Sequence, residues 1–302
     1  MVKPVLQGRC VLFYKRQNGT AYLLLLPLIL LFGLFTVYPF FYGVFISLHQ
    51  WDGFGAKRFI GLANYIRALT DESLYAAAFH NVQYALGTVT GKLVLSFCLA
   101  LLMQRKFKGV TFFRAVFFVP VVLSATTVGI IWARIYDPVL GLFNNLLSRI
   151  SLISEPILWL GDPKLAIWSV VIVDLWKWIG YHTVILLAGL TTIPDELYES
   201  ASIDGANYLQ KFFFITIPQM RGVILMNLTI ALMGAFSVFD LVYIMTKGGP
   251  YKSTEVILTF MYNQTFAGGN TNYGYGSTIA MLLFVIILCI TILMNKLINR
   301  ED

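Results

Sequence analysis

Charged residues and cysteine are scarce in this sequence, and each scarcity excludes a class of protein. Only 12% of the 302 residues are charged and 58% are hydrophobic, whereas soluble domains carry about 25% charged and about 45–50% apolar residues. Cys10 is expected in the cytoplasm and Cys98 and Cys289 lie in apolar stretches, so the three cysteines offer no extracellular disulfide framework and no spacing for a metal cluster. We therefore expect a membrane protein without a metal site.

Catalytic motifs are also missing from the sequence. It contains neither a Gly-x-Ser-x-Gly nucleophile motif nor a His-Glu-x-x-His zinc motif. The segment from Gly87 to Leu93 looks like a phosphate loop, but it has three residues rather than four between its glycines and no Ser or Thr after Lys92. We therefore expect this chain to be no enzyme and to bind no cofactor of its own.

Six long apolar runs are the main feature that the sequence does contain. A helix needs about 20 apolar residues to cross a bilayer. The runs cover approximately residues 22–47, 82–103, 112–135, 165–190, 223–245 and 278–298. Lipid admits only helices and closed barrels, and continuous runs of this length do not alternate as barrel strands do. The sequence predicts an all-α membrane protein with six transmembrane helices.

The positive charges orient these helices in the membrane. Lys15 and Arg16 precede the first run, and a basic cluster in residues 105–114 fills the short connection between the second and third runs. Because positive charges favour the cytoplasmic side, we predict that both termini are cytoplasmic. The predicted organisation is a cytoplasmic segment over residues 1–21, a membrane domain over 22–298 and a cytoplasmic tail over 299–302.

One polar, glycine-containing segment separates the fourth run from the fifth. This connection, residues 191–222, contains YESASIDGANYLQKFFFITIP, which runs from Tyr198 to Pro218. Pro194 and the acidic residues after it suit the first turn of a helix, and the small residues at 200–206 would let another protein approach closely. We predict a helix-turn-helix that docks a cytoplasmic partner. The alternative is an amphipathic linker on the bilayer, which would favour a basic polar face.

The same segment resembles the cytoplasmic signature of permease subunits of ATP-binding cassette (ABC) importers. That signature reads Glu-Ala-Ala, three residues, Gly, nine residues, Ile-x-Leu-Pro. Here Ser200 replaces the middle Ala, and Ile217 replaces the Leu. The resemblance implies coupling to ATPase subunits through Glu199, Ser200, Ala201, Asp204, Gly205, Ala206, Ile215 and Pro218.

Further stretches are similar to carbohydrate-uptake permeases, the group that contains the maltose and glycerol phosphate systems. They include TVYPFFYGVFISLHQWDGF, FRAVFFVPVVLSATTVGIIW and FDLVYIMTKGGPYKSTEVILTFMYNQTF. The resemblance implies a type I importer fold in a bacterial or archaeal cytoplasmic membrane, a second similar permease and two cytoplasmic ATPases that hold ATP and Mg.

The resemblance also implies an extracytoplasmic binding protein that delivers a sugar, with an oligosaccharide favoured. No nucleic acid is expected as a partner. The alternative class is a secondary transporter or a channel for a small polar solute. Such proteins often show inverted repeats and intramembrane ion ligands, and the cytoplasmic signature would then have no explanation.

Aromatic and polar side chains in the fourth and fifth runs are candidates for the substrate path, because a sugar offers hydroxyl groups and apolar ring faces. The candidates are Trp178, Tyr181, His182, Phe236, Ser237 and Asp240. Helical spacing places Trp178 with His182, and Phe236 with Asp240, on shared faces. The alternative is that the aromatic residues belong to an interfacial belt.

Four ionisable residues fall inside the apolar runs, where a charge at the bilayer centre costs about 2.5–3.5 kcal/mol on insertion scales. They are Lys92, Asp174, Lys177 and Asp240. The spacing of Asp174 and Lys177 predicts an ion pair between them on one helical face. We expect Lys92 to snorkel or to reach a backbone carbonyl, and the resemblance places Asp240 near a gate.

Overall fold

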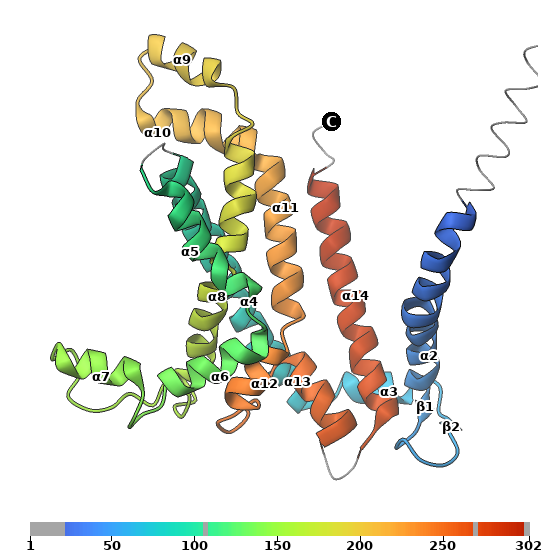
Figure 1. The fold of residues 1–302 in the computed structure, drawn as a ribbon. Coiled ribbons are helices and arrows are strands. Elements are labelled where there is room, and N and C mark those ends of the chain that lie inside the picture. Colours follow the sequence, from blue (N-terminus) through green and yellow to red (C-terminus); the bar gives the residue numbers. More distant parts are fainter. Residues whose placement is uncertain (1–21, 105–107, 268–270, 299–302) are drawn as a thin grey trace, which may run out of the picture.

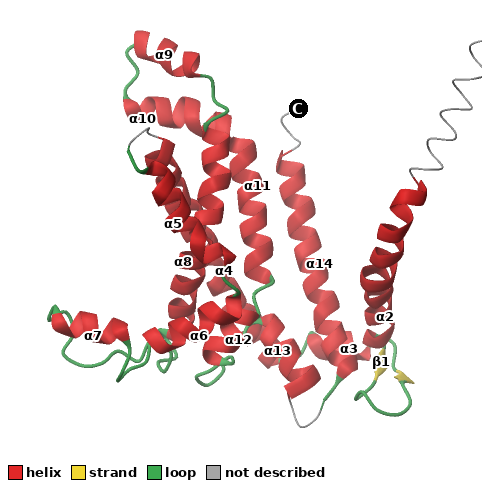
Figure 2. Ribbon diagram, viewed as in Figure 1, coloured by secondary structure: helices red, strands yellow, loops and turns green. Residues whose placement is uncertain are grey.

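The computed structural model describes residues 22–104, 108–267 and 271–298. This part of the chain is mostly helical, with loops between the helices and one short antiparallel hairpin (Figures 1 and 2). The predicted terminal segments 1–21 and 299–302, with Cys10, lie outside the described residues, as do residues 105–107 of the basic cluster.

The elements are joined by connections of different length, and the longest covers residues 150–165 between α7 and α8. The first span, Tyr22–Ser47, includes η1 and α2. The bounds are η1 Gly33–Val37, α2 Tyr38–Ser47, β1 His49–Gln50, β2 Arg58–Phe59, α3 Ala63–Ala68, α4 Glu72–Gln104, α5 Val110–Val122, α6 Ala125–Ile135, α7 Leu142–Arg149, α8 Ala166–Leu190, α9 Asp195–Ile203, α10 Tyr208–Lys211, η2 Phe212–Thr216, α11 Ile217–Phe236, α12 Asp240–Thr246, α13 Ile257–Tyr262, η3 Asn263–Ala267 and α14 Tyr273–Ile298.

The prediction of a six-helix membrane protein is confirmed, with a break in the third span. Within the described residues, five helical stretches are long and apolar enough to cross a membrane, and the bent pair α5 and α6 makes a sixth. The pair is bent by 100°. Pro120 lies in the last turn of α5, Leu123 is extended, and Ser124 caps α6 by accepting from the backbone N–H of Thr127. Proline and a strong N-cap together favour a break at this point.

The fifth span lies closer to the N-terminus than predicted. It runs as one helical stretch from Tyr208 to Phe236 instead of from 223 to 245. Beyond it, α12 is a separate short helix that buries Leu241, Val242 and Met245. The hydropathy of the sequence does not reveal this break, because apolar residues lie on both sides of it. The predicted shared face of Phe236 and Asp240 is therefore wrong, since the two residues belong to different helices.

The centre of the bundle is the crossing of α4 and α8. A Cβ atom on Gly87 would lie 2.9 Å from the Trp168 ring, and one on Gly91 would lie 2.6 Å from the Leu175 side chain. Glycines four residues apart let membrane helices approach closely. The segment that looks like a phosphate loop is thus a packing seam between two helices.

The two ends of the bundle differ in character. The helices α9 and α10 project from one end, here called the α9 end, and α7, α12, α13 and the hairpin gather at the other, the α12 end (Figure 1). The start of the first span and the end of α14 both lie toward the α9 end (Figure 1). This arrangement is the one expected of an even number of crossings.

Candidate functional site

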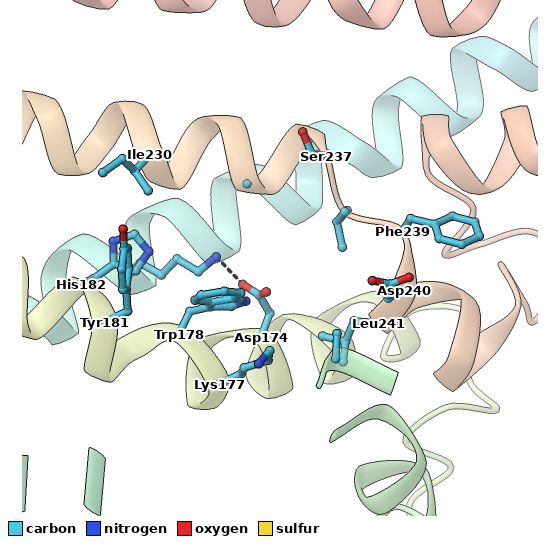
Figure 3. A pocket seen from close by; sticks show the side chains of 14 residues that line it. Asp174, Lys177, Trp178, Tyr181, His182, Ile230, Ser237, Phe239, Asp240 and Leu241 are labelled. Atoms are coloured by element: carbon cyan, nitrogen blue, oxygen red, sulfur yellow. Dashed lines mark ion pairs between the residues drawn. The ribbon is translucent and has the colours of Figure 1, made fainter. Parts of the chain in front are cut away.

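A cavity of about 470 Å³ lies beside α8, α11 and the connection from α11 to α12 (Figure 3). Its lining residues are Lys92, Ala125, Asp174, Lys177, Trp178, Tyr181, His182, Ile230, Gly234, Ser237, Val238, Phe239, Asp240 and Leu241. All of the substrate-path candidates except Phe236 are in this set. Phe236 instead packs against two clusters of buried apolar side chains.

A buried ion pair forms part of the cavity wall. Lys92 Nζ of α4 lies 2.5 Å from Asp174 Oδ2 of α8, and the two side chains are 4% and 8% exposed (Figure 3). The predicted pair of Asp174 with Lys177 is therefore wrong. Asp174 faces α4 across the glycine seam, and a partner on a neighbouring helix cannot be read from spacing along one helix.

Lys177 has a different role at the broken third span. Its ammonium group donates to the carbonyl oxygens of Pro120 (3.3 Å), Val121 (3.2 Å) and Leu123 (2.5 Å). The last turn of a helix leaves carbonyls without intrahelical partners, and a cation there interacts favourably with the helix dipole. Lys177 thus stabilises the end of α5 at the edge of the cavity.

His182 is held by a polar residue that the sequence did not single out. His182 Nδ1 lies 2.7 Å from Asn227 Oδ1 of α11, and both residues are buried. An amide oxygen accepts hydrogen bonds, so the histidine donates from Nδ1. The signal that was available in the sequence was an asparagine within an otherwise apolar run.

Aromatic rings line one side of the cavity. The rings of Trp178 and Tyr181 meet edge to face at 5.9 Å between centroids, and the Lys177 ammonium lies 4.8 Å from the Trp178 centroid. Figure 3 shows these α8 side chains on one side and Ser237 and Asp240 on the other. A cavity with aromatic faces, a hydroxyl group and a carboxylate suits a polar solute that has apolar faces. Among the described residues, no group of three or more His, Cys, Asp or Glu could hold a metal ion.

The α9–α10 segment, residues 195–211, is exposed at its end of the bundle. Neither α9 nor α10 has a buried residue, and Ile203 is 88% exposed. Gly205 makes the turn with a φ of +76°, a conformation that favours glycine. A hollow of about 330 Å³ at this turn is lined by Ala201, Asp204, Gly205, Ala206, Gln210, Lys211, Phe214 and Ile215. Glu199 and Ser200 are exposed on α9, and Pro218 lies in the first turn of α11.

Local contacts fix the shape of this segment and join it to the fifth span. Asn207 and Gln210 form a reciprocal capping box, and Lys211 donates to the Ser202 hydroxyl. The Tyr198 hydroxyl lies 2.9 Å from the Thr216 hydroxyl. Tyr198 ties α9 to the base of the same helical stretch that reaches the cavity near Gly234.

Comparisons with known proteins agree on one family. The model described as "Binding-protein-dependent transport system inner membrane component" matches residues 16–301. The probable ABC transporter permease protein YurN of Bacillus subtilis is 40% identical over 91% of this chain and 94% of its own length. The trehalose/maltose transport system permease protein MalF of Thermococcus litoralis is 36% identical over 93% and 94%.

The fold has a counterpart among solved structures. A chain of a bacterial alginate ABC transporter, solved in complex with an alginate pentasaccharide-bound periplasmic protein, superposes with a TM-score of 0.83. The match covers 94% of this chain and 96% of that one at 22% identity. Similarity at this level of identity shows a shared fold.

Proposed function

Because the chain belongs to the family of binding-protein-dependent transport system inner membrane components, we propose that it is the permease subunit of an ATP-driven importer for a sugar, with an oligosaccharide favoured. The protein crosses the inner membrane several times. The observation that carries the proposal is the continuous helical stretch from Tyr208 to Phe236, which joins the exposed α9–α10 segment to the cavity. The sugar is supported by relatives such as the trehalose/maltose permease.

The proposed orientation puts the α9 end in the cytoplasm and the α12 end outside. Lys108 and Arg114 lie at or near the start of α5, which is at the α9 end (Figure 1). The positive-inside rule then assigns this end to the cytoplasm. Both termini are cytoplasmic in this arrangement, and an extracytoplasmic binding protein delivers the sugar at the α12 end.

Coupling runs through the α9–α10 segment. Two cytoplasmic ATPase subunits bind ATP and Mg and carry out hydrolysis, while this chain and a second, similar permease enclose the path. When the ATPases close, the docked segment moves, and the contact between Tyr198 and Thr216 passes that movement to α11. ATP shifts the equilibrium between the outward-open and inward-open states only if the ATPases bind these two states with different affinity.

The cavity is the proposed binding site for the sugar within the membrane. Trp178 and Tyr181 offer ring faces for stacking, while Ser237 and Asp240 offer hydrogen bonds to hydroxyl groups. His182, held by Asn227, shapes the wall between them. Phe236 supports the cavity from the apolar core.

The docking proposal is tested by reversing one exposed charge. Glu199→Lys should leave the permease folded, because Glu199 is exposed, and should lower the amount of ATPase that co-purifies with it. Gly205→Val should act in the same direction, because a β-branched residue is strained at the φ of +76° that this turn adopts. Glu155→Lys, an exposed acidic residue of the connection between α7 and α8, is the control. Co-purification and sugar uptake at wild-type levels in both α9–α10 variants would contradict the proposal.

A further inference from the structure

A row of six aromatic rings crosses the α12 end and reaches the cavity. Five of the rings lie between residues 239 and 273, in α12 with its preceding residue, α13, η3 and the start of α14, and the sixth comes from the hairpin. In spatial order the row contains Trp51, Tyr273, Phe266, Tyr262, Tyr243 and Phe239. We call this set the aromatic row.

The spacing along the row is even. Ring centroids are 5.2 Å apart from Trp51 to Tyr273, 5.5 Å from Tyr273 to Phe266 and 5.4 Å from Phe266 to Tyr262. Tyr262 then lies 5.2 Å from Phe239, and the Tyr243 ring stacks on Phe239 at 5.2 Å. Each ring is in contact with the next, and Tyr262, Tyr243 and Phe239 form a triangle of mutual contacts at the inner end.

One end of the row lies beside the transmembrane cavity. Phe239 lines the cavity together with Ser237 and Asp240. Figure 3 shows the Phe239 ring beside Asp240, pointing away from Trp178 and the centre of the cavity. The elements that carry the rest of the row lie along the α12 end, from α12 to the hairpin (Figure 1). The row therefore connects the cavity with the surface that is proposed to face outward.

The rings of the row all keep some exposed surface. Phe266 is 55% exposed, and the other five are partly exposed. By contrast, Tyr84, Tyr136 and Tyr275 are at most 1% exposed. Tyr275 makes the difference clear, since it lies two residues from Tyr273 on the same helix. A ligand could therefore reach the rings of the row, whereas Tyr275 is covered.

The backbone holds the outer part of the row in place. Gly53 has a φ of +100°, and a Cβ atom there would overlap the Tyr273 ring. The backbone N–H of Asn272 donates to the Gln264 carbonyl at 2.9 Å, which fixes the start of α14 against η3. The ring positions are thus set by the fold, and a ligand would meet a surface that is already arranged.

We propose that the aromatic row is a stacking surface along which a sugar chain passes from the α12 end into the cavity. This inference rests on the proposed function and names its substrate class as chains of linked sugars. Sugar rings have apolar faces that stack on aromatic rings, and a chain keeps some contacts while it exchanges others. A single sugar covers only one or two rings at a time and gains less from the row.

The test measures uptake by the complete complex of this chain, its companion permease, the ATPases and the binding protein in proteoliposomes. The probes are glucose, galactose, arabinose and xylose, each as the single sugar and as chains of two to four units. Phe266→Leu removes the ring but keeps an apolar side chain, and Phe266→Tyr keeps the ring. Phe54→Leu, an 83% exposed ring of the hairpin loop outside the row, is the control. Size-exclusion chromatography checks that each complex is assembled.

The wild-type complex should import chains with a higher kcat/KM than the matching single sugar. Phe266→Leu should lower kcat/KM about fivefold to tenfold for the longest chain, the effect of about one lost ring contact, and less for shorter ones. Phe266→Tyr and Phe54→Leu should match the wild type. Two results would overturn the proposed role of the aromatic row and leave the proposed function standing. One is a wild-type complex that imports only single sugars, and the other is a Phe266→Leu loss that does not depend on chain length. A wild-type complex that imports no sugar would contradict both.

Discussion

The α9–α10 segment and the cavity belong to one bundle, but their structures depend on contacts of different range. In the segment, the capping box joins Asn207 to Gln210, and Lys211 reaches Ser202. In the cavity wall, Lys92 pairs with Asp174 and His182 with Asn227, each pair between two different helices. The segment is shaped by its own residues, while the cavity exists only when several spans are correctly packed.

This difference predicts two kinds of mutational effect, one on partner binding and one on folding. An exposed segment with local contacts can lose a partner without losing its fold. A cavity wall made of long-range polar contacts cannot lose one of them without disturbing the helices that carry it. The predictions below test this separation, beginning with the change that should have the largest effect.

The largest effect is expected from breaking the buried ion pair. Lys92→Met or Asp174→Leu alone leaves an uncompensated buried charge, which costs about 3–5 kcal/mol. Thermal unfolding of the purified complex in detergent should show a strong loss of stability for each variant. The double variant should recover most of that loss, because replacing a whole buried pair by apolar residues is often neutral. Single variants as stable as the wild type would show that the pair is not structural.

A smaller effect is expected from two glycines of the spans. A Cβ atom on Gly180 would overlap the Phe117 carbonyl oxygen where α8 crosses α5, whereas one on Gly222 of α11 has open space around it. Gly180→Ala should therefore cost about 1–3 kcal/mol by overpacking. Gly222→Ala should be neutral or stabilise the helix by about 0.5–1 kcal/mol. Denaturation of the two variants under one set of conditions checks the difference, and equal stabilities would show that the α5–α8 crossing is not close.

The smallest effect on stability is expected at Ser237, where the change should appear in sugar preference instead. Ser237→Ala removes one hydroxyl group from the exposed cavity wall and changes the volume little. A lost hydrogen bond of about 1 kcal/mol corresponds to about a fivefold rise in KM for sugars that use it. Competition uptake with a sugar panel measures this, with Ser148→Ala on α7 as the control. An unchanged preference would move the sugar contacts away from Ser237.

The range of contacts also explains which features could be predicted from the sequence. The six spans follow from hydropathy, and the turn at Gly205 lies within a short signature that contains its own helix starts and glycine. Local patterns of this kind depend on neighbours in the chain. The α9–α10 segment was therefore predictable as a structure before the fold was known.

The cavity wall was harder to predict because its partners come from other helices. Spacing along one helix predicts that Asp174 pairs with Lys177, whereas its partner in the structure is Lys92 across the α4–α8 seam. Lys177 depends on the break after α5, which hydropathy does not register. The end of the fifth span at Phe236 was missed for the same reason, since the chain stays apolar while it changes direction.

The central claim is that this chain transports sugar only as part of an ATP-driven complex. The direct measurement is accumulation of radiolabelled sugar in proteoliposomes that contain this chain, its companion permease and the ATPases, with the binding protein added. The account predicts accumulation against a gradient that requires both ATP and the binding protein, and that Glu199→Lys lowers. Accumulation by this chain alone, driven by an ion gradient and independent of ATP, would contradict it and identify a secondary transporter.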